Sequence, residues 1–294
     1  MAPSSDVAET ARLDERMTQE VLDLAAAVAE HDGVAALSEA SLLALRRGED
    51  VRHLLVGGLE PAGYAQVDPV AGTAELTVRP ESRRRGNGAA LLHAVRRLAP
   101  GVAVWAHGDL PAARALAAAS GMERVRELLQ MALDLPAPGV PLETAPAAHG
   151  LPQARTFRPG QDEEAWLRLN GRAFASHPEQ GRMTLEDLRA RQDESWFDPS
   201  VLWVVPDEHD GELLAAMWVK ILPGDDAGEI YVLGVDPDAQ GRGLGRRLTS
   251  LALAEMTARG LRRSTLYVEG DNTAARRTYE QKGFTCVATD VQYR

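Results

Sequence analysis

The sequence predicts an α/β fold, with helices packed on a mixed sheet, that occurs twice in tandem. The chain of 294 residues is long enough for two domains at roughly 150 residues each. Residues 136–152 are rich in proline and lack an apolar period, which is typical of a semi-rigid linker. The halves on either side share a repeated sequence pattern. We therefore expect domains at residues 1–135 and 153–294, joined by a linker at 136–152.

Each half is expected to contain the same elements in the same order. A helical region and several strands come first, and a strand then leads through a glycine-rich loop into a helix. A short strand, another helix and a last strand follow. This alternation favours a mixed sheet with helices on its faces. The predicted ranges are helices at 6–30 and 162–174, strands at 201–205, 213–221, 102–106 and 264–268, and helices that begin near Gly88 and Gly245.

Two segments of the first half align with segments of the second half. The stretch around the glycine-rich loop aligns without a gap, and the stretch that begins at His107 aligns with the one that begins at Glu269. Such self-similarity indicates two related domains with one topology. The matched pairs around the loop are Val78 with Val235, Pro80 with Pro237, Gly86 with Gly243 and Gly88 with Gly245.

The charge and the cysteine count exclude several classes of protein. The net charge of −11 argues against a main partner that is nucleic acid or an anionic membrane, because no overall field attracts phosphate. The single cysteine, Cys286, rules out an internal disulfide framework. The seven histidines do not have metal-ligand spacing, so no metal is expected. These features predict a cytoplasmic monomer that acts on small molecules.

The loop at residues 240–245 is the main candidate for a binding site. It joins a strand to a helix, where unpaired N–H groups and the helix dipole favour an anion. It is not a Walker loop, because Gly245 is followed by Arg246 rather than by lysine. It is not the dinucleotide fingerprint either, because Leu248 stands where the third glycine belongs. Alone, such a loop could be a simple tight turn, but it occurs twice.

This loop resembles the acetyl-CoA loop of the GNAT superfamily of N-acetyltransferases. The shared pattern is Gln/Arg-x-x-Gly-x-Gly/Ala after a strand that ends in V-x-P, and residues 83–88 fit it too. Residues 272–284 are similar to a later block of that superfamily, so both halves are expected to be GNAT acyltransferase domains that use acetyl-CoA. The binding residues that the resemblance implies are Leu233, Gly234, Val235, Gln240, Gly241, Arg242, Gly243, Leu244, Gly245, Arg246, Asn272, Thr273, Ala274, Ala275, Arg276 and Arg277 in the second half, and Leu76, Thr77, Val78, Arg84, Arg85, Gly86, Asn87, Gly88 and Ala89 in the first.

The resemblance also implies catalytic roles in the second half. Glu229 would remove a proton from the acceptor amine through water, and Tyr279 would protonate the leaving thiolate. Backbone N–H groups near Leu233 would stabilise the developing oxyanion. Each side chain also has a structural interpretation, since Tyr279 could pack in the core and Glu229 could be a solvated strand residue.

The repeat provides an internal comparison for these roles. In the gap-free alignment Glu229 corresponds to Gly72, and at the second spacing Asn272 corresponds to Leu110 and Tyr279 to Ala117. The first half therefore keeps the loop and lacks the candidate acid, base and CoA-arm residues. We expect it to bind acetyl-CoA without catalysing transfer.

Within the superfamily, strings in both halves are similar to those of the mycothiol acetyltransferase family of actinobacteria. They include Trp105-Ala-His-Gly108, Trp196-Phe-Asp-Pro199 and residues 229–237. The resemblance implies acetylation of the cysteinyl amine of desacetylmycothiol, a thiol-sugar. The substrate contacts that it implies are Glu39, Glu179, Lys220, Glu229 and Tyr267.

Each of these contacts could also have a purely structural role, and two other functions stay open. Glu39 could be a first-turn helix acid, Lys220 an exposed strand residue, and residues 177–179 a simple turn. An acetyltransferase of another small amine, such as an aminoglycoside or a peptide N-terminus, would carry the same motifs. So would an acetyl-CoA sensor without catalysis.

Overall fold

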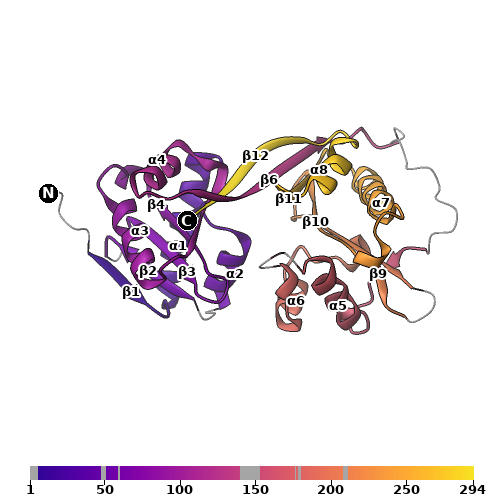
Figure 1. Ribbon diagram of the computed structural model, residues 1–294, viewed down its shortest axis with the longest axis horizontal. Coiled ribbons are helices and arrows are strands. Elements are labelled where there is room, and N and C mark those ends of the chain that lie inside the picture. The colour runs from indigo at the N-terminus through magenta and orange to yellow at the C-terminus, as the bar shows by residue number, and fades with distance from the viewer. Residues whose placement is uncertain are drawn as a thin grey trace. The chain divides into compact units, whose positions relative to one another are not determined.

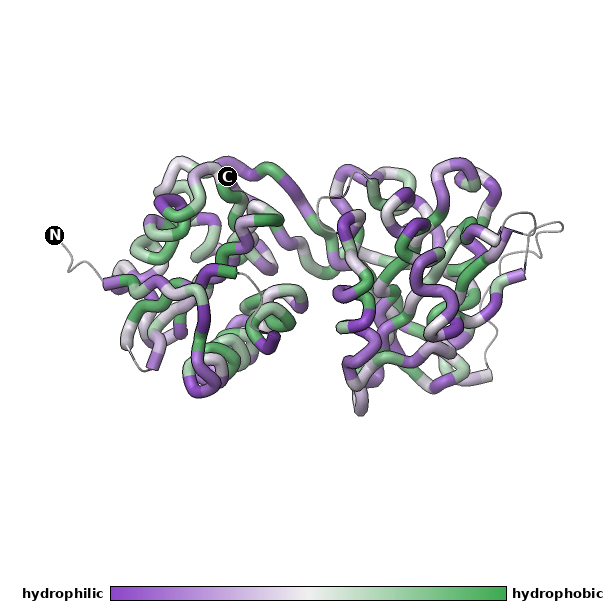
Figure 2. The backbone as a smooth tube through the Cα atoms, turned by 90° about the horizontal axis from the view of Figure 1, so that it is seen from below, coloured by the Kyte–Doolittle hydropathy of each residue, from purple (hydrophilic) through white to green (hydrophobic). Residues whose placement is uncertain are grey.

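The computed structural model describes residues 6–47, 51–58, 60–139, 153–175, 177, 180–207 and 211–294. It divides into two compact units, each described here by itself. Unit 1 comprises Met1–Leu129, Glu269–Asp271 and Ala288–Arg294, and unit 2 comprises Gln130–Val268 and Asn272–Val287. The two ends marked N and C in Figure 2 both belong to unit 1. The predicted linker lies outside the described residues from residue 140 onward.

Unit 1 contains a mixed sheet in which the strands follow each other in chain order until the last position. Neighbours pair antiparallel except β4 and β5, which pair parallel. The end of β12 lies antiparallel to β5, through Val291↔Ala106 to Tyr293↔Val104. The strands are β1 (Val7–Thr10), β2 (Arg52–Val56), β3 (Gly63–Asp68), β4 (Thr73–Val78), β5 (Ala103–Ala106) and β12 (Thr285–Tyr293).

Helices cover both faces of this sheet (Figure 1). Successive strand residues point to opposite faces. Accordingly, Leu55 packs in one core with α1 (Glu15–Asp32) and α2 (Glu39–Arg47), and Leu54 packs in another with α3 (Asn87–Leu98). Helix α4 (Pro111–Ala119) contributes Leu116 to the second core.

Unit 2 repeats this plan around strands in the order β6, β11, β10, β9, β8, β7. Its aromatic core joins Trp166 and Leu169 of the first helix of the unit to Trp218 and Val232 of the sheet. The strands are β6 (Arg124–Asp134), β7 (Arg155–Thr156), β8 (Leu202–Pro206), β9 (Leu213–Lys220), β10 (Ala227–Val235) and β11 (Arg263–Glu269), and the helices are α5 (Glu163–Ala173), α6 (Leu185–Gln192), α7 (Leu244–Ala258) and α8 (Thr273–Glu280).

The repeated segment has the same local structure in both units. A 3-10 turn follows the strand, at Pro80–Ser82 and at Pro237–Ala239, and a glycine with positive φ then begins the next helix. Gly86 has φ 89° before α3, and Gly243 has φ 83° before α7. Glycine adopts this conformation without the steric cost that other residues have. The predicted mixed α/β fold is confirmed.

The start of the chain is not helical as far as predicted. Residues 7–10 form β1, which pairs antiparallel with β2 from Val7↔Val56 to Thr10↔His53. Helix α1 begins only at Glu15, where the Asp14 side chain accepts a hydrogen bond from the Met17 N–H. The prediction of a helix from residue 6 was wrong because an edge strand is stabilised by its partner, which is distant in sequence. No helix among the described residues is long and apolar enough to cross a lipid bilayer.

Candidate active site

Strand β10 stops pairing with β11 just before Leu233, near which the sequence analysis expects backbone N–H donors for the oxyanion. The parallel pairing with β11 extends from Ala227↔Arg263 to Ile230↔Leu266, whereas the pairing with β9 continues to Val235↔Ala215. The Asp236 N–H donates to the Leu214 carbonyl of β9, at 2.9 Å. Because N–H groups alternate between the two edges of a strand, Leu233 and Val235 direct theirs to the opposite edge. The N–H groups of Leu233 and Val235 therefore point into the gap between β10 and β11, whereas the N–H group of Gly234 points toward β9.

A bulge at Tyr231 distinguishes β10 from its counterpart in unit 1. The register between β10 and β9 shifts between Ile230 and Val232, whereas the pairing of β3 with β4 is unbroken. A bulge inserts one extra residue into a strand. The gap-free correspondence of Glu229 with Gly72 is therefore wrong by one residue. Glu229 pairs with Thr265 as Thr73 pairs with Ala103, so Thr73 is its structural counterpart.

The glycine-rich loop of unit 2 presents open space at the start of α7. Gly241 and Gly243 have φ of 75° and 83°, and a Cβ placed on either would meet no atom within 4 Å. The acidic residues beside the loop are paired, because Arg172 of α5 donates to Asp236 at 2.6 Å and to Asp238 at 2.7 Å. The hydrogen bond from Arg172 lowers the pKa of Asp236. Arg172 therefore offsets part of the negative charge that these two carboxylates place beside the loop.

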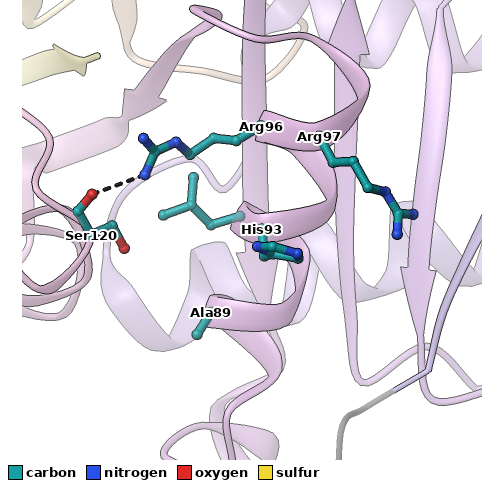
Figure 3. A pocket seen from close by; sticks show the side chains of 6 residues that line it. Ala89, His93, Arg96, Arg97 and Ser120 are labelled. Carbon is teal, nitrogen blue, oxygen red and sulfur yellow. Dashed lines mark hydrogen bonds between the residues drawn. The ribbon is translucent and has the colours of Figure 1, made fainter.

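The loop of unit 1 has the same shape with different side chains. Gly86 has φ 89° and open space above it, and Arg84 has a positive φ of 61°. Arg83 donates to Asp32 through both terminal nitrogens, at 2.8 and 2.7 Å. A pocket of about 450 Å³ continues along α3 from the loop and is shown in Figure 3. Its lining residues are Ala89, Leu92, His93, Arg96, Arg97 and Ser120.

Glu229 lies beside two of the predicted substrate contacts. It is directly opposite Lys220 of β9 in the antiparallel pairing, so the two side chains share one face of the sheet. Tyr267 stands two residues after Thr265, the partner of Glu229 on β11, and therefore lies on the same face. Its side chain is 45% exposed. The structure thus places Glu229, Lys220 and Tyr267 on one face of the sheet.

Three further residues line this face, and the sequence analysis assigned no role to them. The Lys220 Nζ lies 4.9 Å from the ring centroid of Trp196 and 5.4 Å from that of Tyr231. The Arg191 Nε donates to the Tyr231 hydroxyl at 2.9 Å. Trp196 and Tyr231 occur in two of the strings that carry the family resemblance, which is the one signal that could have identified them.

Tyr279 and Asn272 both belong to the segment that follows β11. Tyr279 is 6% exposed on α8 and packs against Phe284 with ring centroids 5.7 Å apart. Burial raises the pKa of its hydroxyl, so it stays protonated at neutral pH. The Asn272 side chain caps α8 by accepting from the Ala275 N–H at 3.1 Å.

The counterparts in unit 1 lack these groups, but one carboxylate was missed. Leu110 is the N-cap residue before α4 and makes no side-chain cap hydrogen bond, and Ala117 is buried in the position of Tyr279. Strand β4 nevertheless carries Glu75, which is buried, accepts from the Ser38 N–H at 2.7 Å and lies 3.5 Å from His107. The expectation that this half has no candidate base is corrected to this extent, although Glu75 is already engaged by its neighbours.

The two remaining predicted substrate contacts are Glu39 and Glu179. Glu39 is the first residue of α2 and belongs to unit 1. Glu179 lies outside the described residues. Across the described part of the chain, no group of three or more His, Cys, Asp and Glu side chains could hold a metal ion.

Comparisons with known proteins agree with this geometry. The model of the acetyltransferase (GNAT) family matches residues 165–284. A mycothiol acetyltransferase of Thermomonospora curvata is 52% identical, covering 96% of this chain and 95% of that protein. One of Beutenbergia cavernae is also 52% identical, covering 94% and 95%. A tandem GNAT protein from the clavulanic acid biosynthesis pathway, which is 20% identical, has the same fold with a TM-score of 0.70 and covers 98% of this chain and 97% of its own.

Proposed function

The chain belongs to the mycothiol acetyltransferase family and is an N-acetyltransferase, and we propose that it acetylates the cysteinyl amine of desacetylmycothiol. The observation that carries this proposal is that one strand of unit 2 provides both a carboxylate and backbone N–H donors that point into the gap between β10 and β11. Glu229 lies on β10 before the bulge, and the N–H groups of Leu233 and Val235 follow it. Acyl transfer to an amine requires both kinds of group.

The glycine-rich loop and the gap between β10 and β11 would hold acetyl-CoA. This cosubstrate supplies an acetyl group as a reactive thioester. The pyrophosphate would accept hydrogen bonds from N–H groups at residues 241–245, where the open space above Gly241 and Gly243 admits it closely. Arg242 and Arg246 would add positive charge at the same place. The Leu233 N–H would donate to the thioester oxygen as negative charge develops on it.

Glu229 would act as the base and Tyr279 as the acid. An α-amino group has a pKa of about 7.7 to 8.0, so a carboxylate that relays one proton through water is sufficient. As the C–N bond forms and the C–S bond breaks, the amine proton passes to Glu229. The sulfur takes a proton from Tyr279, whose hydroxyl is protonated at neutral pH. Lys220 and Tyr267 would contact the acceptor beside Glu229.

We further propose that unit 1 binds acetyl-CoA without transferring its acetyl group. The loop around Gly86 and the basic side chains of the adjoining pocket, His93 and Arg97, support binding of an anionic nucleotide. Thr73 in the place of Glu229 and Ala117 in the place of Tyr279 support the absence of transfer. Unit 1 includes the segment Ala288–Arg294, so a truncated first half would lack part of its sheet. The full chain with Glu229→Gln tests the absence of transfer from unit 1, which predicts loss of turnover, and the number of acetyl-CoA molecules that this variant binds per chain, expected to be two, tests binding by unit 1.

The acceptor is tested by a panel of amines with the full chain. The protein is incubated with acetyl-CoA and desacetylmycothiol, an aminoglycoside, or a peptide, and free CoA is followed. We expect the highest kcat/KM with desacetylmycothiol. A higher value with another amine would replace the proposed acceptor, and no turnover with any amine, together with acetyl-CoA binding, would indicate a sensor.

A further inference from the structure

The ammonium group of Lys220 is held by two aromatic rings in unit 2. We define Trp196 and Tyr231 as the aromatic pair. The Lys220 Nζ lies over both rings, 4.9 Å and 5.4 Å from their centroids. Cations within about 6 Å of an aromatic centroid are attracted by the negative face of the ring. The rings themselves are 5.2 Å apart, so one ammonium contacts both.

The surroundings hold the two rings of the aromatic pair in place. Trp196 is 5% exposed and packs against Trp218, which is fully buried. The bulge turns Tyr231 into the same core, where its ring lies 5.3 Å from Trp218. The Tyr231 hydroxyl accepts from Arg191, which also donates to the Asp187 carbonyl of α6 at 2.9 Å. Lysine has a flexible four-carbon stem, so contacts with its surroundings decide where its ammonium group lies.

We propose that Trp196 and Tyr231 are positioning residues that hold the Lys220 ammonium on the Glu229 face of the sheet, where it donates hydrogen bonds to a polyhydroxylated acceptor. This role depends on the proposed function, in which Lys220 and Glu229 lie beside the acceptor. The aromatic pair does not touch the reacting atoms. It acts by restricting Lys220, so that the acceptor meets an ammonium that is already in place.

The position of the lysine can be tested without any acceptor. Lys220 and Lys282 are the two lysines of the sequence, so reductive methylation with ¹³C-formaldehyde gives two lysine signals beside that of the terminal amine. Lys220→Met and Lys282→Arg assign them. We expect the Lys220 methyl signal to be shifted by the ring currents and to move toward the Lys282 position in Tyr231→Leu, which leaves the ring of Trp196 in place. Coincident signals in the unsubstituted protein would overturn the proposal.

The role of the aromatic pair is tested by kinetics with three single variants and one double variant. Tyr231→Leu is expected to raise the acceptor KM about tenfold, equivalent to ~1.4 kcal/mol, while kcat and the acetyl-CoA KM stay within about twofold. Tyr231→Phe keeps the ring and is expected to restore most of the loss. Because Tyr231 acts through Lys220, Lys220→Met with Tyr231→Leu should be no worse than Lys220→Met alone.

Two outcomes of this cycle contradict the proposal. Additive losses in the double variant would mean that Tyr231 does not act through Lys220. An unchanged acceptor KM in Tyr231→Leu would mean that the position of Lys220 does not matter for binding. The proposed function is judged separately, from the acceptor preference of the unsubstituted protein, so the two can fail independently.

Discussion

Replacement of His107 by glutamine is expected to destabilise unit 1 at neutral pH and much less at high pH. The His107 ring lies between two carboxylates, with Nδ1 3.1 Å from Asp290 and Nε2 3.5 Å from Glu75. Burial opposes its charge, but hydrogen bonds and charge from Asp290 and Glu75 raise the pKa of His107 to about 10. Asp290 belongs to the C-terminal segment of β12, so this cation connects the end of the chain to β5.

The size of the effect follows from what each carboxylate loses. Removal of one partner from a buried ion pair costs about 3 to 5 kcal/mol, because the other charge remains buried. In His107→Gln, Asp290 still accepts the hydrogen bond from the Gly108 N–H, at 2.7 Å, and Glu75 still accepts the one from the Ser38 N–H, at 2.7 Å. We therefore expect a loss of about 3 kcal/mol at pH 7, the lower end of that range.

The pH dependence has a definite sign. The folded-state pKa of His107 is above its unfolded value of 6.5, so its contribution is complete below pH 6.5 and is lost as the pH rises through about 10. Glu75, whose pKa is lowered by His107 and Ser38 against the effect of burial, stays ionised throughout this range. The difference in unfolding free energy between His107→Gln and the unsubstituted protein should therefore shrink between pH 7 and pH 10.5.

Urea unfolding followed by circular dichroism at both pH values measures this difference. Hydrogen exchange at pH 7 localises it, and β5 and the end of β12 should lose the most protection. His93→Gln, which replaces an exposed histidine of the same unit, is the matched control and should change stability by less than about 0.5 kcal/mol. A loss of equal size at pH 7 and pH 10.5 would refute the reasoning, as would unchanged exchange in β12.

Three further variants test the proposed chemistry. Glu229→Gln should lower kcat by a factor of about 10² to 10⁴ and leave the affinity for acetyl-CoA unchanged. Calorimetric titration with acetyl-CoA measures that affinity, and unchanged turnover would mean that Glu229 is not the base. Tyr279→Phe keeps the packing on Phe284 and should lower kcat by at least about tenfold without a change in thermal midpoint, and normal turnover would mean that the sulfur takes its proton from elsewhere. Gly243→Ala strains a residue with φ 83° and should raise the acetyl-CoA KM at a constant acceptor KM, whereas the matched change Gly86→Ala in unit 1 should leave the acetyl-CoA KM for turnover unaltered.

The glycine-rich loops are predictable from sequence because their requirement is local. Gly86 and Gly243 both adopt positive φ at a helix start, and each is preceded by a proline turn that the sequence displays directly. The repeat of this pattern predicted the fold of both halves. The capping role of Asn272 on α8 is likewise local, since donor and acceptor are three residues apart.

Other features depend on partners that are distant in the chain. Residues 7–10 are a strand because β2 lies beside them, and the extra residue at Tyr231 is visible only against the register of β9. That single residue changes the counterpart of Glu229 from Gly72 to Thr73. Nothing in the spacing of Trp196, Lys220 and Tyr231 indicates that their side chains meet.

The sequence by itself determined the mixed α/β class, the repeated anion loop and the family, because periodicity, turn geometry and motif spacing are properties of neighbouring residues. The tertiary structure decided which face carries Glu229, which rings hold Lys220, and that Asp290 at the end of the chain pairs with His107. The physical reason is that side-chain contacts depend on which strands lie side by side and in what register. A shift of one residue in register turns a side chain to the opposite face.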